Sequence, residues 1–332
     1  MAAYYLGVDT GATKSVALLA GEDGRILGRG LGGPGNWEAV GWSGTRAVLE
    51  AIIAQALAGA RLSRRDISGA GFGLAGYDWP EDRAPHEALL RELGFHEPWA
   101  LVNDAALGLA AGADQGWGVV VSAGTSCNAY GRNADGAIGR LSGNSRLGEY
   151  AGAGELVQYG LQAVSRAWSL RGPRTALTAV FLQAAGAADA TDLLAGVSRG
   201  RYTLHAGLAP LIFRAAASGD GVAQEAVDWA GRGLGDLALG VVRQVRLQDE
   251  NFPVVLAGSF FNGSPRLGEQ VIEMVRTEAP GAFLARLEMP PVTGALLLAM
   301  EAAGPLTGAA RTAVLAQLRA QFGPEGAYFN GA

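Results

Sequence analysis

The chain has 332 residues, of which 49% are hydrophobic and only 17% are charged. This length and composition allow a large core, favour two domains, and exclude disorder as the main state. The net charge of −5, with no basic run, argues against nucleic acid and anionic membranes as principal partners. No apolar stretch reaches the roughly 18 residues of a membrane span. The single cysteine, Cys127, excludes internal disulfides and Cys-based zinc sites, so we expect a cytoplasmic protein.

The first 113 residues alternate predicted strands and helices. Tight turns at 10–14 and at Asp23-Gly24 separate three apolar runs, as in a ribbon of strands. The alternation that follows indicates an α/β sheet. We predict strands at 4–9, 15–20, 25–30, 70–76 and 99–104, and helices at 43–60, 81–94 and 105–113.

A second ribbon of the same kind starts at Trp117. It repeats the first at a spacing of about 112 residues, with Gly11 on Gly124 and the Asp23-Gly24 turn on Asp135-Gly136. We interpret this as a duplicated supersecondary unit, with chance similarity in a glycine-rich chain as the alternative. The predicted strands of the second ribbon are 117–122, 129–133 and 137–140.

The rest of the chain is mostly helical. Residues 150–247 are predicted as helices, and a domain boundary is placed near 112–116. The C-terminal part adds strands at 252–258 and 282–288 and helices at 266–279, 294–303 and 307–321.

The first tight turn suits phosphate and magnesium. The strand that ends in Asp9 is followed by TGATKS, where backbone N–H groups, hydroxyls and the charge of Lys14 form a concavity for phosphate. Asp9 would hold magnesium, directly or through water. On this loop alone, an ordinary hairpin with polar turn residues is the alternative. The second copy, at 124–126, favours two loops that clamp a triphosphate.

Asn103-Asp104 closes a predicted strand and opens a helix. A carboxylate at the carboxyl end of a strand lies where α/β folds bind ligands, so Asp104 could accept the proton of an attacking hydroxyl. Helix capping by Asp explains the same residue equally well.

Two further loops suit a sugar and a base. Asn36-Trp37, after GGPG, pairs an amide with an aromatic ring on which a sugar can stack, although most tryptophans only pack. The small residues at 256–259 would let a nucleotide base approach the backbone, with a plain strand-to-helix turn as the alternative.

Taken in order, five motifs carry a family resemblance. They are GVDTGATKS (7–15), VNDAALG (102–108), VVVSAGTSC (119–127), VLAGSFFN (255–262) and GALLLA (294–299). The set resembles the nucleotide-site motifs of the sugar kinase, actin and heat-shock chaperone superfamily. It is most similar to the BadF/BadG/BcrA/BcrD ATPase family, which includes N-acetylglucosamine kinases.

The resemblance implies two ribonuclease-H-like domains of the actin-like ATPase fold, with ATP and magnesium in the cleft between them. The implied N-terminal domain, 1–114, carries the first phosphate loop, the sugar loop and the general base. The second domain, 115–293, has a helical insertion and carries the second phosphate loop and the adenosine pocket. Helices at 294–332 follow, and the first of them is expected to pack on the N-terminal domain.

Site residues are also implied by the resemblance. Asp9 would serve magnesium, and Asp104 would be the catalytic base. ATP would be bound by Gly11, Thr13, Lys14, Gly124, Thr125, Ser126, Gly258, Ser259 and Asn262. The sugar would be bound by Asn36, Trp37, Gly76, Asn103 and Glu149.

The chain departs from the family at 141–154. Family kinases carry Gly-Gly-Trp-Gly and then Gly-Asp-Glu-Gly-Ser near the sugar, whereas this chain reads LSGNSRLGEYAGAG. Glu149 is the residue that could replace the acid, with Ser142 and Asn144 as other polar candidates. The usual Gly-Gly pair of the adenosine motif is Gly258-Ser259 here.

The resemblance implies ATP- and magnesium-dependent phosphorylation of an amino sugar or related hexose, with N-acetylglucosamine or glucosamine as the small-molecule partner. One alternative is an ATPase that activates a partner enzyme. Family members of that kind need an iron–sulfur cluster bridged between subunits, for which a homodimer of this chain would supply two thiolates instead of four. Another alternative is a non-catalytic, actin-like nucleotide switch. A homodimer is one assembly that the sequence allows.

Overall fold

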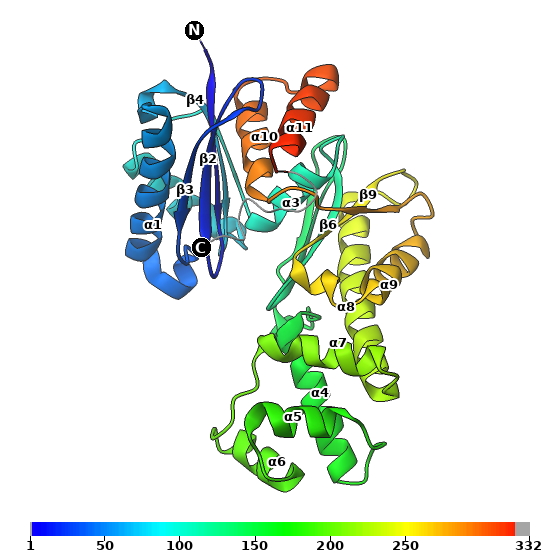
Figure 1. Cartoon of the computed structure of the whole chain (residues 1–332). Helices are drawn as coiled ribbons and strands as arrows, with labels where there is room; N and C mark the ends of the chain where they lie inside the picture. The colour runs from blue at the N-terminus through cyan, green and yellow to red at the C-terminus, as the bar shows by residue number, and fades with distance from the viewer. Residues whose placement is uncertain (1, 323–332) are drawn as a thin grey trace. The chain divides into compact units, whose positions relative to one another are not determined.

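The computed structural model describes residues 2–322 (Figure 1). These residues form two compact units. The first unit comprises 2–120, 134–136 and 285–322, and the second unit comprises 121–133 and 137–284. None of the helices among residues 2–322 has the length and apolar content needed to cross a bilayer. The last ten residues of the predicted segment 294–332 lie outside the described part of the chain.

A five-stranded mixed sheet forms the centre of the first unit. Its strands lie in the order β3-β2-β1-β4-β5. Both β1–β2 and β2–β3 are antiparallel, whereas β1–β4 and β4–β5 are parallel. The strands are β1 (Tyr4–Thr10), β2 (Ser15–Gly21), β3 (Ile26–Gly32), β4 (Ile67–Leu74) and β5 (Trp99–Val102).

Helices cover both faces of this sheet. Strand β2 alternates its side chains: Ala17 and Leu19 pack against α1, while Val16 and Leu18 pack against α10 and α11. Figure 1 shows α1 on one face and α10 with α11 on the other. The helices of the unit are α1 (Trp37–Ala60), α2 (Arg83–Glu92), α3 (Asp104–Gly112), α10 (Val292–Ala303) and α11 (Gly308–Phe322).

Glycines in the central strands let α10 lie directly on the sheet. A Cβ on Gly71 of β4 would lie 2.0 Å from the carbonyl oxygen of Ala295, and one on Gly7 of β1 would lie 2.7 Å from the amide nitrogen of Leu296. Any side chain at these two positions would push the helix away. Part of the glycine excess of the sequence is therefore explained by close helix–sheet packing.

The second sheet repeats the plan of the first. Its order, β10-β9-β6-β7-β8, matches that of the first sheet when β6 is placed on β1, β7 on β2, β8 on β3 and β9 on β4. The predicted α/β class with a duplicated sheet is therefore confirmed. The strands are β6 (Gly118–Ala123), β7 (Cys127–Arg132), β8 (Ile138–Leu141), β9 (Pro253–Ala257) and β10 (Phe283–Arg286).

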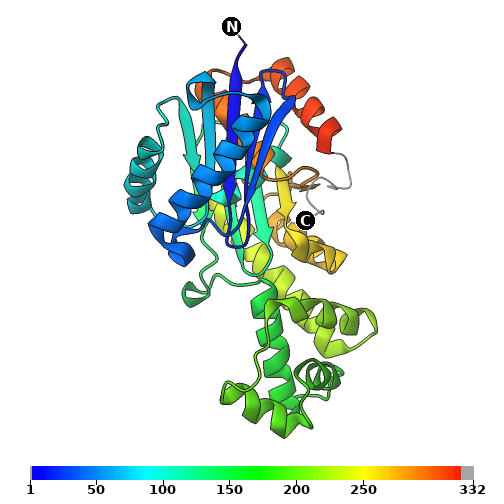
Figure 2. The ribbon, with the colours of Figure 1, turned by 60° about the vertical axis from the view of Figure 1, so that its left-hand side comes forward.

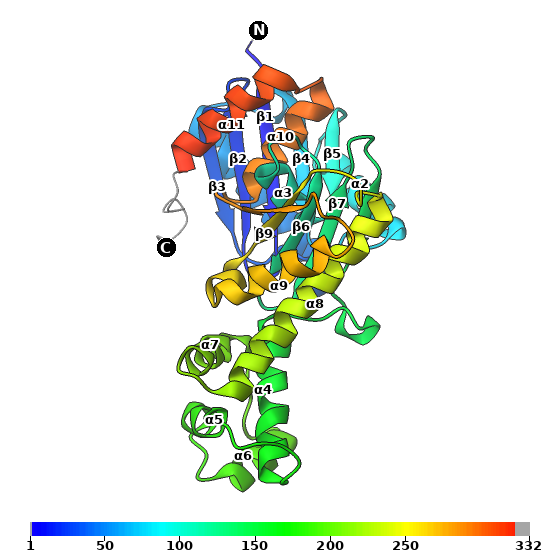
Figure 3. The ribbon, with the colours of Figure 1, turned by 90° about the vertical axis from the view of Figure 1, so that its right-hand side faces the viewer.

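Most of the second unit is a helical insertion between β8 and β9. Helix α8 packs on β7 and β8, while α5 and α6 lie at the far end of α4 (Figures 2 and 3). The helices of the insertion are α4 (Ala153–Trp168), α5 (Leu177–Ala185), α6 (Ala190–Ser198), α7 (Ala209–Ala217) and α8 (Gly221–Val245). Helix α9 (Pro265–Arg276) follows β9.

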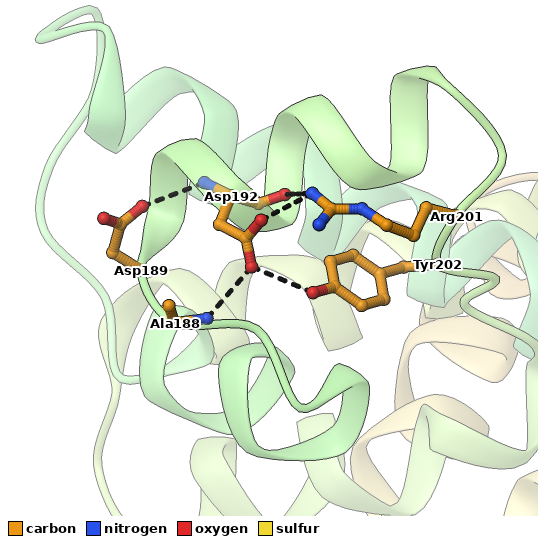
Figure 4. A network of polar contacts seen from close by, with 5 residues as sticks. All are labelled: Ala188, Asp189, Asp192, Arg201 and Tyr202. Atoms are coloured by element: carbon orange, nitrogen blue, oxygen red, sulfur yellow. Dashed lines mark hydrogen bonds and ion pairs between the residues drawn. The ribbon is translucent and has the colours of Figure 1, made fainter.

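A polar network fixes α6 (Figure 4). Asp189 caps the helix by accepting a 2.8 Å hydrogen bond from the amide of Asp192. The Asp192 carboxylate accepts hydrogen bonds from the Tyr202 hydroxyl, at 2.9 Å, and from the Ala188 amide, at 3.1 Å, and it pairs with Arg201. These bonds tie both ends of α6 together within the insertion.

Helix α1 begins earlier than predicted. The sequence predicts a helix at 43–60 with Asn36-Trp37 in a loop, but Asn36 is the N-cap and Trp37 is the first helical residue. The Asn36 side-chain oxygen accepts a 2.9 Å hydrogen bond from the Glu38 amide. The helix is interrupted at Gly41, where φ is 69°, and this break hides its first turn from the sequence pattern.

Buried Arg311 joins three helices of the first unit. From α11, its guanidinium donates to the carbonyl oxygens of Ala110 in α3, at 3.1 Å, and of Asp114, at 2.8 Å. It also pairs with Glu301 of α10 at 2.5 Å. A buried charge with this many partners leaves them unsatisfied when it is removed.

We expect Arg311→Met to lower the free energy of unfolding by about 3 kcal/mol, because Glu301 and the carbonyls lose their partner. Urea unfolding followed by circular dichroism measures this change. Arg46→Met is the control, since Arg46 forms exposed pairs with Glu50 and Glu92 and should change stability far less. Equal losses in the two variants would contradict the role given to Arg311.

Candidate active site

Predicted site residues of the first unit gather at one edge of its sheet. Strands β1, β4 and β5 are parallel neighbours, and their register places Asp9 beside Gly73 and Gly73 beside Val102. The carboxyl ends of these strands therefore meet at the same edge, where α/β sheets bind ligands. Asp9, Gly76 and Asp104 all lie at or just beyond that edge.

Asn103, and not Asp104, caps helix α3. The Asn103 side-chain oxygen accepts a 2.9 Å hydrogen bond from the Ala105 amide, and Asp104 is the first helical residue. The Asp104 carboxylate accepts a 3.1 Å hydrogen bond from the same Ala105 amide. Capping therefore does not account for Asp104, which is the explanation that the sequence left open.

The two acids of this edge have strongly shifted pKa values. Burial, followed by the negative charge of Asp104, raises the pKa of Asp9 to about 7, although Lys14 opposes the rise. Burial, followed by the charge of Asp78, raises the pKa of Asp104 to about 6. Two desolvated carboxylates that repel one another are typical of sites that hold a cation or move a proton.

The first tight turn exposes polar side chains to solvent. Gly11 donates its amide to the carbonyl oxygen of Lys14 at 3.0 Å, which closes the loop, and Thr13 and Lys14 are exposed. The buried Thr10 hydroxyl has no hydrogen-bond partner among the described residues. The Gly35 amide donates to the carbonyl oxygen of Gly11 at 3.0 Å, so the turn is held against the segment that leads into α1.

The predicted sugar residues Asn36, Trp37 and Gly76 come together. The Trp37 indole nitrogen donates a 2.7 Å hydrogen bond to the carbonyl oxygen of Gly76. At Gly76 the φ angle is 82°, and a Cβ there would lie 2.6 Å from the side-chain oxygen of Asn36. Trp42, which the sequence analysis missed, stacks on Trp37 with ring centroids 4.8 Å apart.

The other two predicted sugar residues, Asn103 and Glu149, form hydrogen bonds with neighbouring protein groups. Asn103 is 9% exposed and donates from its amide nitrogen to Asp78 and Tyr77. Glu149, in the second unit, accepts hydrogen bonds from the Ser142 hydroxyl, at 3.1 Å, and the Gly143 amide, at 2.9 Å. Glu149 therefore closes a loop within the divergent segment 141–154, and its contact with a sugar stays a prediction.

A pocket of about 600 Å³ lies within the second unit. Predicted nucleotide residues line it, from the second tight turn (Gly124 and Thr125) and from the segment after β9 (Ser259 and Asn262). Other lining residues come from the insertion, and the sequence did not predict them because nothing in the helical pattern marks them. They include Gly207, Phe213 and Arg214.

The remaining predicted nucleotide residues flank this pocket along the chain. Ser126 is exposed and ends the second tight turn, in which the Gly124 amide donates to the carbonyl oxygen of Ser126 at 2.8 Å. Gly258 has a φ of 99°, and a Cβ there would lie 2.2 Å from the carbonyl oxygen of Ala123. Only glycine permits this approach of the β9 end to β6.

Among residues 2–322, no group of three or more His, Cys, Asp or Glu side chains is arranged to hold a metal ion. Asp9 lies in the last, turn-facing part of β1, and the first tight turn at 10–14 has no carboxylate of its own. Magnesium that arrives with a nucleotide needs only one or two protein carboxylates, because phosphates and water complete its shell. The desolvated Asp9 carboxylate fits such an ion.

Comparisons with known proteins point to kinases of amino sugars. The chain is 28% identical over 312 residues to the N-acetyl-D-glucosamine kinase of Dictyostelium discoideum, covering 89% of this chain and 97% of that one. It is 25% identical over 299 residues to the N-acetylmuramic acid/N-acetylglucosamine kinase of Clostridium acetobutylicum, covering 89% and 98%.

Solved structures agree on the fold. A Chromobacterium violaceum protein, solved as a candidate N-acetylglucosamine kinase, matches with a TM-score of 0.59 and 26% identity, over 89% of this chain and 98% of that one. A ROK family glucokinase from Streptomyces griseus matches with a TM-score of 0.55 and 19% identity, over 90% and 98%. The sequence profile of the BadF/BadG/BcrA/BcrD ATPase family matches residues 6–299. The chain belongs to this ATPase family.

Proposed function

We propose that this protein is an ATP-dependent kinase that phosphorylates a hydroxyl group of N-acetylglucosamine or a related amino sugar, with Asp104 as the general base. The observation that carries the proposal is the pair of desolvated acids, Asp9 and Asp104, at the carboxyl edge of the first sheet. The two relatives named as kinases of such sugars, each matched over 89% of this chain, support the substrate class.

Asp104 suits the role of the base. A carboxyl group with a pKa of about 6 is ionised at neutral pH, yet it binds a proton more readily than an ordinary aspartate. It would accept the proton of the sugar hydroxyl as that oxygen attacks the γ-phosphate of ATP. The bond from the γ-phosphorus to the bridging oxygen breaks, and ADP leaves with the electron pair.

The charge of the phosphates would be met by the first tight turn. The Gly11 amide closes the turn by its bond to Lys14, so the backbone N–H groups that follow Gly11, together with Thr13 and Lys14, would bind phosphate oxygens. Asp9 would hold magnesium, which supplies charge neutralisation when bound. The buried Thr10 hydroxyl, which has no partner among the described residues, is a further candidate donor at the end of β1.

The second unit would hold the adenosine end of ATP. Its pocket combines small residues, which leave room for a base, with Phe213, whose ring packs near that of Phe260 at 5.3 Å between centroids. Thr125 and Ser126 would add hydroxyl donors for phosphate. The division of the chain into domains at 114/115 and 293/294 stays a prediction. It would assign one phosphate loop to each of the first two domains and the adenosine pocket to the second.

The sugar would be bound beside Asn36 and Trp37. Trp37 is oriented by its bond to Gly76 and backed by Trp42, so its ring is fixed before a ligand arrives. A rigid aromatic face suits the apolar side of a pyranose ring. The alternative of an activating ATPase with a bridged iron–sulfur cluster is less well supported, because Cys127 is buried.

We expect Asp104→Asn to lower kcat by about 10²- to 10⁴-fold, because the amide cannot accept the proton. The dissociation constant for ATP should change little, since no nucleotide contact is removed. Coupled-enzyme detection of ADP and calorimetry measure the two quantities. Asp114→Asn, just beyond the other end of α3, is the matched control.

In the wild type, kcat/KM for the sugar should fall as the pH drops below about 6, because protonated Asp104 cannot act as a base. A profile that stays flat down to pH 5, or an Asp104→Asn variant with wild-type turnover, would contradict the assignment of the base.

Trp37→Ala should raise the KM for the sugar about tenfold or more and leave the KM for ATP unchanged, because it removes a stacking face and no phosphate contact. Steady-state kinetics with each substrate varied separates these effects. Trp168→Ala, which removes an exposed tryptophan of the insertion, should change neither value. An unchanged sugar KM in Trp37→Ala would rule out stacking on this ring.

A further inference from the structure

We infer that Asp78 is a positioning residue for Asp104, acting through the side chain of Asn103. Asp78 lies in the segment between β4 and α2, and no sequence motif marks it. The inference rests on the proposed function of Asp104, and it adds a residue that does not itself touch the reacting atoms.

Asn103 connects the two acids. Its amide nitrogen donates to a carboxylate oxygen of Asp78 at 2.9 Å and to the carbonyl oxygen of Tyr77 at 3.2 Å. Its side-chain oxygen caps α3 at the Ala105 amide. Both amide hydrogens and the oxygen are thus engaged, so the orientation of this side chain depends on Asp78. The first residue of the helix that Asn103 caps is Asp104.

Asp78 is itself held in place. Its backbone amide donates to the Asp82 carboxylate at 2.9 Å, and the next amide, of Trp79, donates to the same oxygen at 2.7 Å. Asp82 therefore fixes the turn that aims Asp78 at Asn103. The short 3-10 helix at Pro80–Asp82 continues from this turn into α2.

The same segment touches the predicted sugar loop. The carbonyl oxygen of Gly76 accepts from Trp37, and that of Tyr77, the next residue, accepts from Asn103. Residues 76–78 therefore connect the ring that would carry the sugar with the start of the helix that carries the base. Because the Asp78 charge also acts on Asp104, the two carboxylates lie within electrostatic reach.

Positioning matters for proton transfer because a base must lie within hydrogen-bond reach of the hydroxyl that it deprotonates. Without Asp78, one Asn103 donor loses its acceptor, and only the bonds to Tyr77 and Ala105 still hold the amide. The start of α3 then loses a fixed cap, and Asp104 samples orientations that do not face the sugar.

The test compares Asp78→Ala with Asp78→Asn and with Glu81→Ala, an exposed acid three residues away. We expect Asp78→Ala to lower kcat about tenfold and to leave the KM for ATP unchanged. Asp78→Asn should restore most of the rate, because its amide oxygen still accepts from Asn103. Glu81→Ala should behave as the wild type. Thermal melts check that each variant is folded.

A double mutant separates action through Asn103 from an independent effect. Asn103→Ser keeps a capping oxygen for α3 but loses the amide that reaches Asp78. If Asp78 acts through Asn103, adding Asp78→Ala to Asn103→Ser should cost no further loss of kcat. Losses that multiply would overturn the inference.

A second readout does not depend on catalysis. In protein labelled with ¹⁵N-asparagine, the side-chain amide signal of Asn103 is assigned by its disappearance in Asn103→Ser. We expect its exchange with solvent to accelerate about tenfold or more in Asp78→Ala and not in Glu81→Ala. Unchanged exchange would show that the contact does not hold the amide and would overturn the inference.

The two proposals fail in different ways. Wild-type protein with no sugar-dependent release of ADP would refute the proposed function, and the positioning role would fall with it. Active wild-type protein with an equally active Asp78→Ala variant would refute only the role of Asp78.

Discussion

The placement of Asp9 and Asp104 at one edge of a sheet is the constraint on which the first unit depends. Burial raises the pKa values of both acids, and a neighbouring negative charge adds to it, that of Asp104 at Asp9 and that of Asp78 at Asp104. The fold therefore bears a free-energy cost that packing elsewhere must offset. Parallel pairing of β1, β4 and β5 brings the strand ends together. The glycines of β1 and β4 allow α10 to pack closely against one face of these strands. In the proposed function, Asp9 would bind a cation and Asp104 would accept the proton of a reacting hydroxyl, which explains why two destabilising buried acids are present.

Much of the fold follows from local chemistry that a sequence displays. Turns such as Asp23-Gly24 and Asp135-Gly136 mark the ends of strands, and their repetition predicts the duplicated sheet that the strand order confirms. Asp9 and Asp104 can be found in the same way, because Asp9 lies near the end of an apolar strand and Asp104 follows one. The predicted nucleotide residues Gly124 and Ser259 are also local to strand ends, and they line one pocket of the second unit.

Other features depend on contacts between distant segments, which a single sequence does not reveal. Asn103 caps α3 through its side-chain oxygen, and its amide nitrogen also reaches Asp78, 25 residues earlier. The first turn of α1 is hidden by Gly41, so Trp37 and its partner Trp42 looked like loop and core residues. Phe213 and Arg214 reach the pocket from a helix whose pattern resembles any other amphipathic helix. The sugar contacts of Glu149 and the domain limits stay predictions.

The central claim is that sugar binding and ATP turnover belong to one reaction. The most direct measurement is magnesium-dependent release of ADP by the purified protein with a panel of amino sugars and hexoses, each beside a sample without sugar. We predict that N-acetylglucosamine or a close relative stimulates release well above the sugar-free rate. Release that is independent of every sugar, or no release at all, would contradict the kinase and favour an ATPase or a nucleotide switch.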